Sequence, residues 1–348
     1  MNISAQEKLL LVRHLAMLLT SGIPLLEALQ ILSSQTKSKS YRKLLDQISS
    51  DIQNGSTLAK SLQKHPKIFD AFFVGIVAVG EDSGTLDESL RYLYEHLAKS
   101  LDLRKKIASA LLYPTVVVVA ALLVAASVII FVIPQLLNLF QGLNVTLPPI
   151  TRAFIAIATF LQQYGLILIV GIIVASILFR IGLGFSWFRK IVDTIVLRLP
   201  IFGNVLVNTA LTTTFRNIGI MMKSGLPITS SLEIARQMAN QKVFEEYLRY
   251  MFLAVEKGKS LAAELEDRKF AHMPVMAIKM LAVGEKTGKL DETCLYLADF
   301  FEQEVDEATK NMTVLLEPII LLIVGVLVAF VALSIISPIY ELTGSIQP

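Results

Sequence analysis

The sequence predicts an all-α membrane protein with two homologous cytoplasmic helical bundles, of about six helices each, and three transmembrane helices. Composition is the first reason, because 54% of the 348 residues are hydrophobic, only 18% are charged and the mean hydropathy is +0.61. The charges crowd into two long stretches that resemble each other, and they are absent from three short stretches. Such a pattern excludes a cytosolic enzyme, a disordered chain and a disulfide scaffold. The net charge of +3 gives no indication of a nucleic-acid partner.

Three apolar segments without an ionised side chain are long enough to cross a bilayer. They cover residues 116–133, about 164–179 and 319–336, and an apolar segment at 153–163 is expected to lie at the interface or to lengthen the second span. Lys and Arg number 14 before the first span, 1 and 17 in the two connections, and 0 after the third span. Because insertion keeps cationic segments in the cytoplasm, the N-terminus and both polar regions are predicted to be cytoplasmic and the C-terminus periplasmic.

The two polar regions are copies of one another at a shift of 203 to 204 residues. Residues 78–88 recur at 282–292, and Pro114 is matched by Pro318. Two copies with the same orientation can be joined only if the chain crosses the bilayer again between them, which explains the unmatched middle span. The predicted regions are, in chain order, a cytoplasmic bundle at 1–110, a transmembrane helix at 111–134, a periplasmic loop at 135–152, an interfacial segment and transmembrane helix at 153–181, a second cytoplasmic bundle at 182–312, a third transmembrane helix at 313–336 and a periplasmic tail at 337–348.

Within each polar region the apolar residues recur at helical spacing, and no alternating strand pattern is present. The run Ser21-Gly22-Ile23-Pro24 is typical of one helix ending and the next beginning. Gly84 is predicted to end a helix in the same way before Thr85, whose hydroxyl would cap the next helix while Glu88 closes a capping box. Lys289 replaces that threonine in the second copy, so the box is predicted for the first copy alone.

The sequence predicts no catalytic, cofactor-binding or metal-binding residues. The segment from Gly284 to Leu290 resembles a phosphate loop, but it has one residue too few between its glycines and a leucine after its lysine. The four histidines have no ligand spacing, and none adjoins Cys294. The acidic residues of the two repeated turns would suit a divalent cation or the positive end of a helix dipole, and the second is favoured. Six turn positions are predicted to set the geometry of the bundles or to contact a partner: Glu81, Gly84, Asp87, Glu285, Gly288 and Asp291.

Two other functional classes compete with a scaffold. A small transporter or permease subunit would need ionisable residues or broken helices at the middle of the membrane, and the three apolar segments contain no ionisable residue. A polytopic membrane enzyme would need titratable groups that converge near the end of a span. The cluster of Arg104, Lys105 and Lys106 is better explained by membrane orientation and by anionic lipid. A non-catalytic scaffold is the remaining interpretation.

Seven motifs in collinear order resemble a known family, the inner-membrane platform proteins of type II secretion systems and type IV pili. They lie at residues 21–25, 80–86, 113–114, 147–152, 199–203, 224–227 and 284–290. The resemblance implies a protein of the bacterial inner membrane with no enzymatic activity and no cofactor. Its implied partners are a hexameric cytoplasmic assembly ATPase, other inner-membrane assembly proteins, pilins or pseudopilins, and further copies of itself. Many members carry an additional N-terminal segment that this sequence does not show, and the resemblance does not separate secretion, pilus assembly and DNA uptake.

Overall fold

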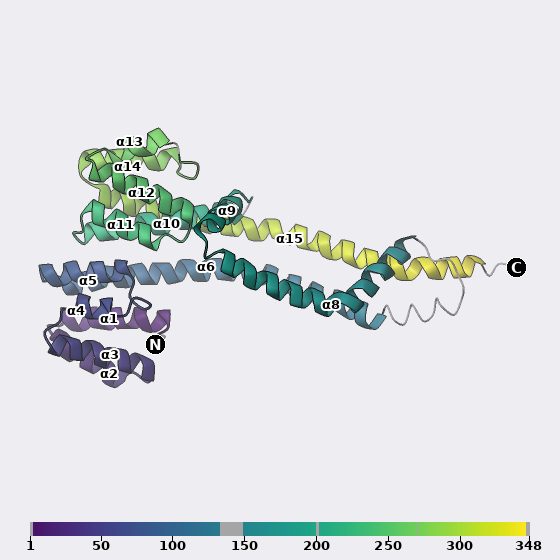
Figure 1. Cartoon of the computed structure of the whole chain (residues 1–348), viewed down its shortest axis with the longest axis horizontal. Coiled ribbons are helices and arrows are strands. Elements are labelled where there is room, and N and C mark those ends of the chain that lie inside the picture. The colour runs from purple at the N-terminus through teal and green to yellow at the C-terminus, as the bar shows by residue number, and fades with distance from the viewer. Residues whose placement is uncertain (1–2, 133–148, 200–201, 269, 346–348) are drawn as a thin grey trace. The chain divides into compact units, whose positions relative to one another are not determined.

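The computed structural model describes all residues except 1–2, 133–148, 200–201, 269 and 346–348 (Figure 1). Every regular element in the described residues is a helix, which confirms the predicted all-α class. The chain divides into two compact units. One unit, here called the polar unit, contains Met1–Lys106 and Lys190–Ala308; the other, the apolar unit, contains Ile107–Arg189 and Thr309–Pro348.

Six helices build the first copy of the repeat. They are α1 (Ala5–Thr20), α2 (Leu25–Gln35), α3 (Lys39–Gln53), α4 (Leu58–Gln63), α5 (Ala71–Ser83) and α6 (Leu86–Ser127). Polar side chains begin several of these helices, since Ser4 forms a capping box with Glu7 at α1 and Asp70 accepts a hydrogen bond from an amide at the start of α5. Helix α6 continues without a break from the polar unit into the apolar unit and contains Pro114.

The second copy repeats the order of the first. Its helices are α10 (Phe202–Lys223), α11 (Ile228–Met238), α12 (Lys242–Glu256), α13 (Leu261–Arg268), α14 (Val275–Thr287) and α15 (Leu290–Ser345), and α9 (Ser186–Arg198) precedes them. Positive φ angles occur at three glycines of each copy and in the same register: Gly22 with Gly225, Gly55 with Gly258, and Gly84 with Gly288. The backbone is therefore duplicated along with the sequence, as predicted.

Both copies contribute to one hydrophobic core inside the polar unit. Phe72 from the first copy and Phe215 and Phe301 from the second are among its largest buried side chains. Helix α5 of the first copy packs against α10 and α11 of the second. Gly75 permits this approach, because a Cβ atom there would lie 3.3 Å from Cδ1 of Ile234. Full burial of each such phenylalanine contributes about 1.5–3 kcal/mol, so apolar packing is a large part of what holds the two copies together.

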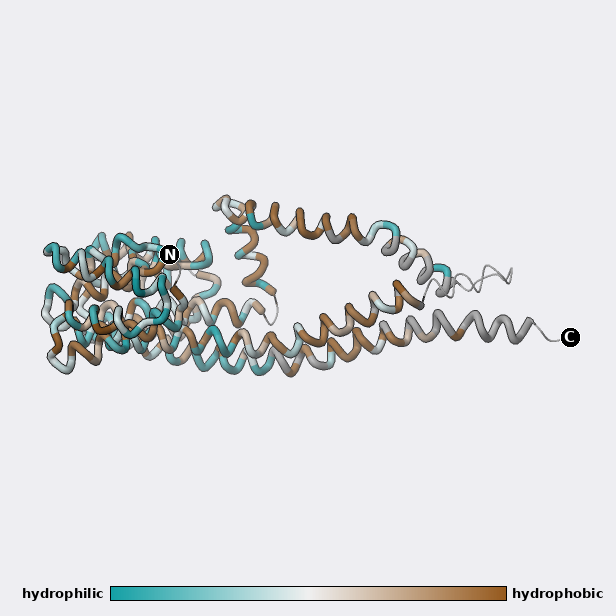
Figure 2. Tube along the Cα trace, turned by 90° about the horizontal axis from the view of Figure 1, so that it is seen from below, coloured by the Kyte–Doolittle hydropathy of each residue, from teal (hydrophilic) through white to brown (hydrophobic). Residues whose placement is uncertain are grey.

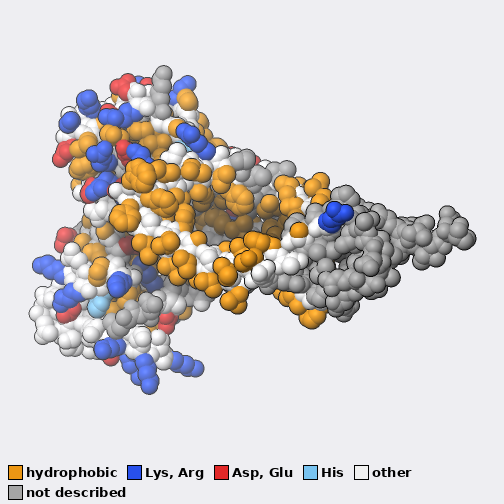
Figure 3. Space-filling model, turned by 45° about the vertical axis from the view of Figure 1, so that its right-hand side comes forward, with side chains coloured by type: hydrophobic (Ala, Val, Ile, Leu, Met, Phe, Trp, Pro, Cys, Tyr) orange, Lys and Arg blue, Asp and Glu red, His pale blue; other side chains and the backbone are white. Residues whose placement is uncertain are grey.

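The helices that could span a membrane lie along α6 and α8 (Pro149–Gly182). Two stretches are long and apolar enough among the described residues, within Leu86–Val124 and Gln163–Gly182. Hydrophobic residues follow one another along most of α8 and along the later turns of α6 (Figure 2). Figure 3 shows one face on which Lys, Arg, Asp and Glu side chains gather over the helical bundles, while hydrophobic side chains dominate away from them.

A third span by this criterion would require α9 and α10, which are bent by 112° at their break, to be counted together. Helix α10 does not suit that role, because Leu211, Phe215 and Met221 are buried in the core of the polar unit. The third span predicted from sequence, 319–336, is helical as part of α15, with exposed apolar side chains such as Leu322. Several of its other side chains lie outside the described residues, so its membrane crossing stays a prediction.

The connections predicted to be periplasmic fall largely outside the described part of the chain. Most of the loop at 135–152 and the end of the tail at 337–348 are among the residues left undescribed. A short π-helical segment, η1 (Val128–Val132), follows α6 directly before the first of these gaps.

Candidate functional site

The repeated acidic turn is built around a glutamate that caps a neighbouring helix. In the first copy, the amides of Leu58 and Ala59 donate to Oε1 and Oε2 of Glu81 at 2.7 and 3.0 Å. These are the first two residues of α4, and Thr57 Oγ1 accepts from the next amide, that of Lys60, at 3.2 Å. Three of the four amides that a helix start leaves unpaired are thereby satisfied. Glu81 thus ties the end of α5 to the beginning of α4.

Glu285 has the same position and the same partners in the second copy. It accepts from the amides of Leu261 and Ala262 at 2.8 and 3.2 Å, and from Ser260 Oγ at 2.6 Å. The positive end of the helix dipole favours the negative charge at both sites. Because both oxygens of each carboxylate bind backbone amides, Glu81 and Glu285 are internal helix caps in the described structure.

Gly84 and Gly288 end α5 and α14 in the left-handed region, with φ angles of 73° and 70°. The amide of the residue after each glycine closes the helix. The Thr85 amide donates to the Gly80 carbonyl at 2.8 Å, and the Lys289 amide donates to the equivalent carbonyl of Gly284 at 2.9 Å.

This closure makes the predicted capping box at Thr85 wrong. The Thr85 amide is already bound to the preceding helix, and the Thr85 hydroxyl lies 2.7 Å from that of Ser83. Glu88 instead accepts hydrogen bonds from Tyr92 at 2.9 Å and from Arg91 at 3.3 Å. In this turn the Thr85 amide closes α5 and does not bind Glu88.

Gly80 and Gly284 are functional residues of the turn that the sequence reasoning missed. A Cβ atom at Gly80 would lie 2.4 Å from Oγ and 2.6 Å from Cβ of Ser89, and one at Gly284 would lie 2.4 Å from Oγ1 of Thr293. These glycines let α5 cross the first turns of α6, and α14 the first turns of α15, at a distance no other residue permits. Their recurrence one residue before the capping glutamate was the available signal.

The two aspartates of the turn differ in their contacts. Asp87 accepts a hydrogen bond from Thr20 Oγ1 at 3.4 Å, which joins the start of α6 to the end of α1. Asp291 is half-buried and makes no hydrogen bond or ion pair within the described part of the chain. The described residues also contain no group of three or more His, Cys, Asp or Glu side chains placed to hold a metal ion.

A network of ion pairs links the two copies inside the polar unit, and the sequence reasoning did not anticipate it. Arg216 of α10, with a side chain only 5% exposed, donates to Asp299 at 2.8 Å and to Glu302 at 2.7 Å, both on α15. Lys99 of α6 binds Asp299 at 2.7 Å, and Lys106 of α6 lies 2.9 Å from Asp306 of α15. Two cations from the first copy and one from the second therefore share one acidic face of α15.

The electrostatic consequence is clearest at Asp299. Partial burial acts to raise the pKa of this carboxyl, but the hydrogen bonds and charges of Lys99 and Arg216 outweigh it and hold the pKa below its ordinary value. In the ion pair between Lys106 and Asp306, the hydrogen bond and the charge of Asp306 raise the pKa of Lys106. The signal in the sequence was an acidic row at helical spacing, residues 299, 302 and 306, and an arginine inside the otherwise apolar α10.

His96 lies beside this network without joining it. Its ring packs against Phe72 with centroids 4.4 Å apart, it is 8% exposed, and its Nδ1 atom has no hydrogen-bond partner among the described residues. Burial lowers the pKa of His96 to about 4, and the nearby charges of Asp70, Arg216 and Lys8 modify that effect. The imidazole is therefore neutral at physiological pH. Burial also raises the pKa of Cys294 to about 12, which disfavours the thiolate form that a nucleophilic cysteine needs.

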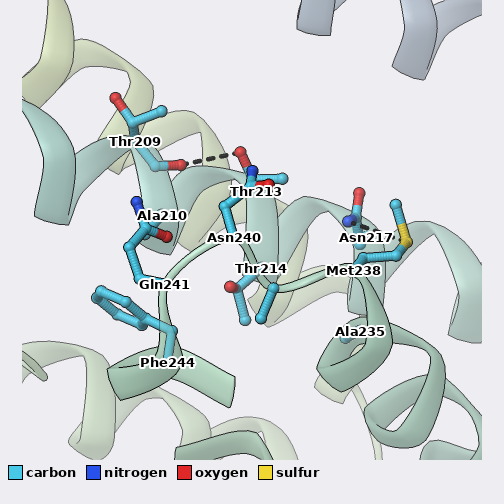
Figure 4. Close-up of a pocket in the computed structure, with 11 residues that line it drawn as sticks. Thr209, Ala210, Thr213, Thr214, Asn217, Ala235, Met238, Asn240, Gln241 and Phe244 are labelled. Atoms are coloured by element: carbon cyan, nitrogen blue, oxygen red, sulfur yellow. Dashed lines mark hydrogen bonds between the residues drawn. The ribbon is translucent and has the colours of Figure 1, made fainter. Parts of the chain in front are cut away.

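A groove in the second copy is lined by uncharged side chains (Figure 4). Its walls are α10, α11, the loop between α11 and α12, and the first turn of α12. Asn217 donates to Met238 Sδ at 3.7 Å, and Thr213 donates to the Thr209 carbonyl at 2.9 Å. The lining residues include no acid, base or thiol, so the threonine hydroxyls of the lining have no general base beside them in the groove to activate them as nucleophiles.

These contacts define a class of protein, an all-helical membrane protein in which a duplicated bundle continues into long exit helices and is held by backbone caps and ion pairs. The sequence matches the family described as type II secretion system (T2SS), protein F, over residues 11–134 and 214–338. These two matched stretches correspond to the two copies of the repeat. The chain belongs to this family, as its motifs predicted.

Three relatives that match nearly the whole chain carry one of two names, type IV pilus assembly protein or type II secretion system protein F. A type IV pilus assembly protein PilC from Thermus thermophilus is 35% identical, over 96% of this chain and 82% of the relative. The protein of the same name from Myxococcus xanthus is 32% identical, over 99% and 82%. A type II secretion system protein F from Xanthomonas campestris is 27% identical, over 96% and 82%.

Proposed function

We propose that this protein is the inner-membrane platform of a type IV pilus or type II secretion machine and couples a cytoplasmic assembly ATPase to the incorporation of pilins or pseudopilins. Membership of the family and the names of the relatives support this role. The structural observation that carries it is the continuity of α6 and α15, each of which begins at an acidic turn of a bundle and extends into an apolar stretch.

The proposed mechanism is mechanical, with no catalytic step in this chain. A helix rises about 1.5 Å per residue, so the 42 residues of α6 extend roughly 60 Å as one continuous helix. Ion pairs from Lys99 and Lys106 to α15 favour joint movement of the two helices. The ATPase would displace the bundles, and the exit helices would transmit that displacement to subunits held in the membrane. Other inner-membrane assembly proteins and further copies of this chain complete the proposed assembly.

Asp87 and Asp291 are the proposed partner contacts among the six turn positions. The glutamates and glycines of the turn have structural partners, whereas Asp291 has no hydrogen bond or ion pair in the described residues. Asp291→Lys should therefore abolish assembly and leave thermal stability close to that of the parent protein. The matched variant Glu292→Lys, at an exposed neighbour, should assemble normally, and equal behaviour of the two variants would refute the contact.

Orientation is part of the proposal, with both bundles cytoplasmic and the C-terminus periplasmic. Cys294 is the only cysteine and is buried, so a Cys294→Ser background permits labelling of single introduced cysteines. A cysteine at Lys289 should react with a membrane-impermeant maleimide only after cells are opened. Labelling of that position in intact spheroplasts would overturn the orientation.

The decisive experiment on function is deletion and complementation in the native host. Loss of surface pili, restored by the intact gene, would identify a pilus platform, and loss of secreted proteins would identify a secretion platform. The purified chain should also retain the assembly ATPase on an affinity column. A deletion strain with normal pili and normal secretion would refute both forms of the proposal.

A further inference from the structure

Helix α9 exposes a continuous apolar face. Trp187, Ile191, Ile195 and Leu199, which follow one another at intervals of four residues, are 73%, 40%, 58% and 45% exposed. Such spacing places the first three side chains on one side of α9, and Leu199 directly follows Arg198, the last residue of the helix. A row of this kind on a water-exposed surface normally marks a binding surface.

The opposite side of α9 is fixed to the second copy of the repeat. Leu197 is buried, Lys190 forms an ion pair with Glu246 at 2.8 Å, and Asp193 accepts a hydrogen bond from the Lys242 amide at 2.6 Å. The last contact caps the start of α12. Because these contacts hold one side of α9, the exposed row is a stable feature of a folded helix.

The first turn of α9 packs against the last turn of α8, the apolar helix that precedes it. The ring of Phe188 meets that of Phe179 edge-on at 5.6 Å, and a Cβ atom at Gly182 would lie 3.0 Å from the Phe188 ring. Only three residues separate the end of α8 at Gly182 from the start of α9 at Ser186. Since each residue spans at most about 3.6 Å, α9 begins within roughly 15 Å of the point where α8 leaves the membrane.

The composition around the apolar row matches a bilayer surface. Arg180 at the end of α8 and Arg198 at the end of α9 are both exposed. Cationic side chains near an apolar helical face favour anionic headgroups, and tryptophan is enriched at the boundary between headgroups and acyl chains.

We propose that α9, together with Leu199 directly after it, is an in-plane membrane anchor, which inserts Trp187, Ile191, Ile195 and Leu199 into the headgroup boundary of a leaflet that contains anionic phospholipid. This inference rests on the membrane location of the chain and is independent of its role in a pilus or a secretion machine. It places the second bundle directly against the bilayer surface.

Trp187 is the only tryptophan, so its fluorescence reports on α9 alone. The full chain would be reconstituted in phosphatidylcholine vesicles with phosphatidylglycerol, with bromine carried at a shallow acyl position. Emission from Trp187 should be blue-shifted and quenched by the brominated lipid. The matched control is Trp187→Phe with Tyr296→Trp, which moves the indole to an exposed position on the bundle and should show little quenching. Quenching of Trp187 no greater than that of the control would overturn the proposal.

A second pair of variants tests the apolar row itself. Ile191→Asn with Ile195→Asn should shift the balance between inserted and released α9 by about tenfold or more, because half-burial of two isoleucines is lost. The control pair, Val275→Asn with Val283→Asn, alters two exposed apolar residues of α14 and should leave the quenching of Trp187 unchanged. A blue-shifted Trp187 that lipid bromine fails to quench would show that protein covers the row and would also refute the proposal. None of these outcomes depends on a pilus or on an ATPase.

Discussion

Replacing Arg216 by methionine is the sharpest test of the ion-pair network between the two copies. Methionine preserves most of the aliphatic length and removes the charge. Duplication supplies the control, because Arg13 occupies the equivalent position in the first copy. Arg13 is exposed and makes a cation–π approach to the ring of Tyr94 at 5.9 Å.

The expected cost follows from burial. Glu302 has a side chain only 15% exposed, and removal of one partner from a buried ion pair costs about 3–5 kcal/mol. Asp299 is 55% exposed and keeps Lys99, so the expected loss for Arg216→Met is about 2–3 kcal/mol. At about 2–4 °C per kcal/mol for a unit of this size, the unfolding temperature should fall by about 4–12 °C. The Arg13→Met variant should lose about 1 kcal/mol or less.

Thermal unfolding of the full chain in detergent, followed by circular dichroism, measures the difference. The double variant Arg216→Met with Glu302→Leu should recover part of the loss, because it removes a half-buried carboxylate that the single variant leaves with only the 3.8 Å ion pair to Lys106. Equal unfolding temperatures for the Arg216→Met and Arg13→Met variants would refute the reasoning. Strictly additive losses in the double variant would show that the pair is not coupled.

Three further predictions concern the turn and the buried histidine. Glu81→Gln and Glu285→Gln should each lower the free energy of unfolding by about 1–2 kcal/mol, since each removes one carboxylate oxygen from a helix start; chemical denaturation that gives parental values for both would contradict the capping role. The pKa of His96 is depressed from 6.5 to about 4, so the unfolded state takes up a proton first and stability falls as pH drops through this window. His96→Phe should remove about 3 kcal/mol of that pH dependence. If the free energy of unfolding of the variant still changes between pH 7 and about pH 4 as much as that of the parent protein, the prediction is wrong. Gly80→Ala should cost about 1–3 kcal/mol through its contact with Ser89, and Ser89→Gly in the same chain should restore part of the loss; no rescue would place the strain elsewhere.

The sequence determined the class of fold and the duplication because both depend on repeating patterns. Helical spacing, charge-free segments and the recurrence of residues 78–88 at 282–292 can all be read from a single chain. Even the left-handed helix ends at Gly84 and Gly288 follow from local chemistry, since glycine adopts positive φ without a Cβ penalty.

The caps and ion pairs that could not be predicted join residues that are distant in sequence and meet only in the folded bundle. Glu81 caps a helix that begins more than twenty residues earlier in the chain, and only the packed bundle brings its carboxylate to Leu58. Arg216 and Glu302 are likewise distant in sequence, so neither one predicts the other. The capping box at Thr85 failed because one amide had two competing local partners, and closure of the preceding helix prevailed.

Pro114 lies within the unbroken α6, and the repeat places Pro318 at the corresponding point of α15. A proline ring removes one amide donor and crowds the carbonyl four residues before it, which weakens that turn without ending the helix. Each of the two long helices thus has a weakened turn at the same register, shortly after the chain passes from the polar unit to the apolar unit, and α15 contains a second proline, Pro338, farther along. Duplication has therefore copied a matched pair of weakened turns along with the bundles, and these are the points at which α6 and α15 would bend most easily.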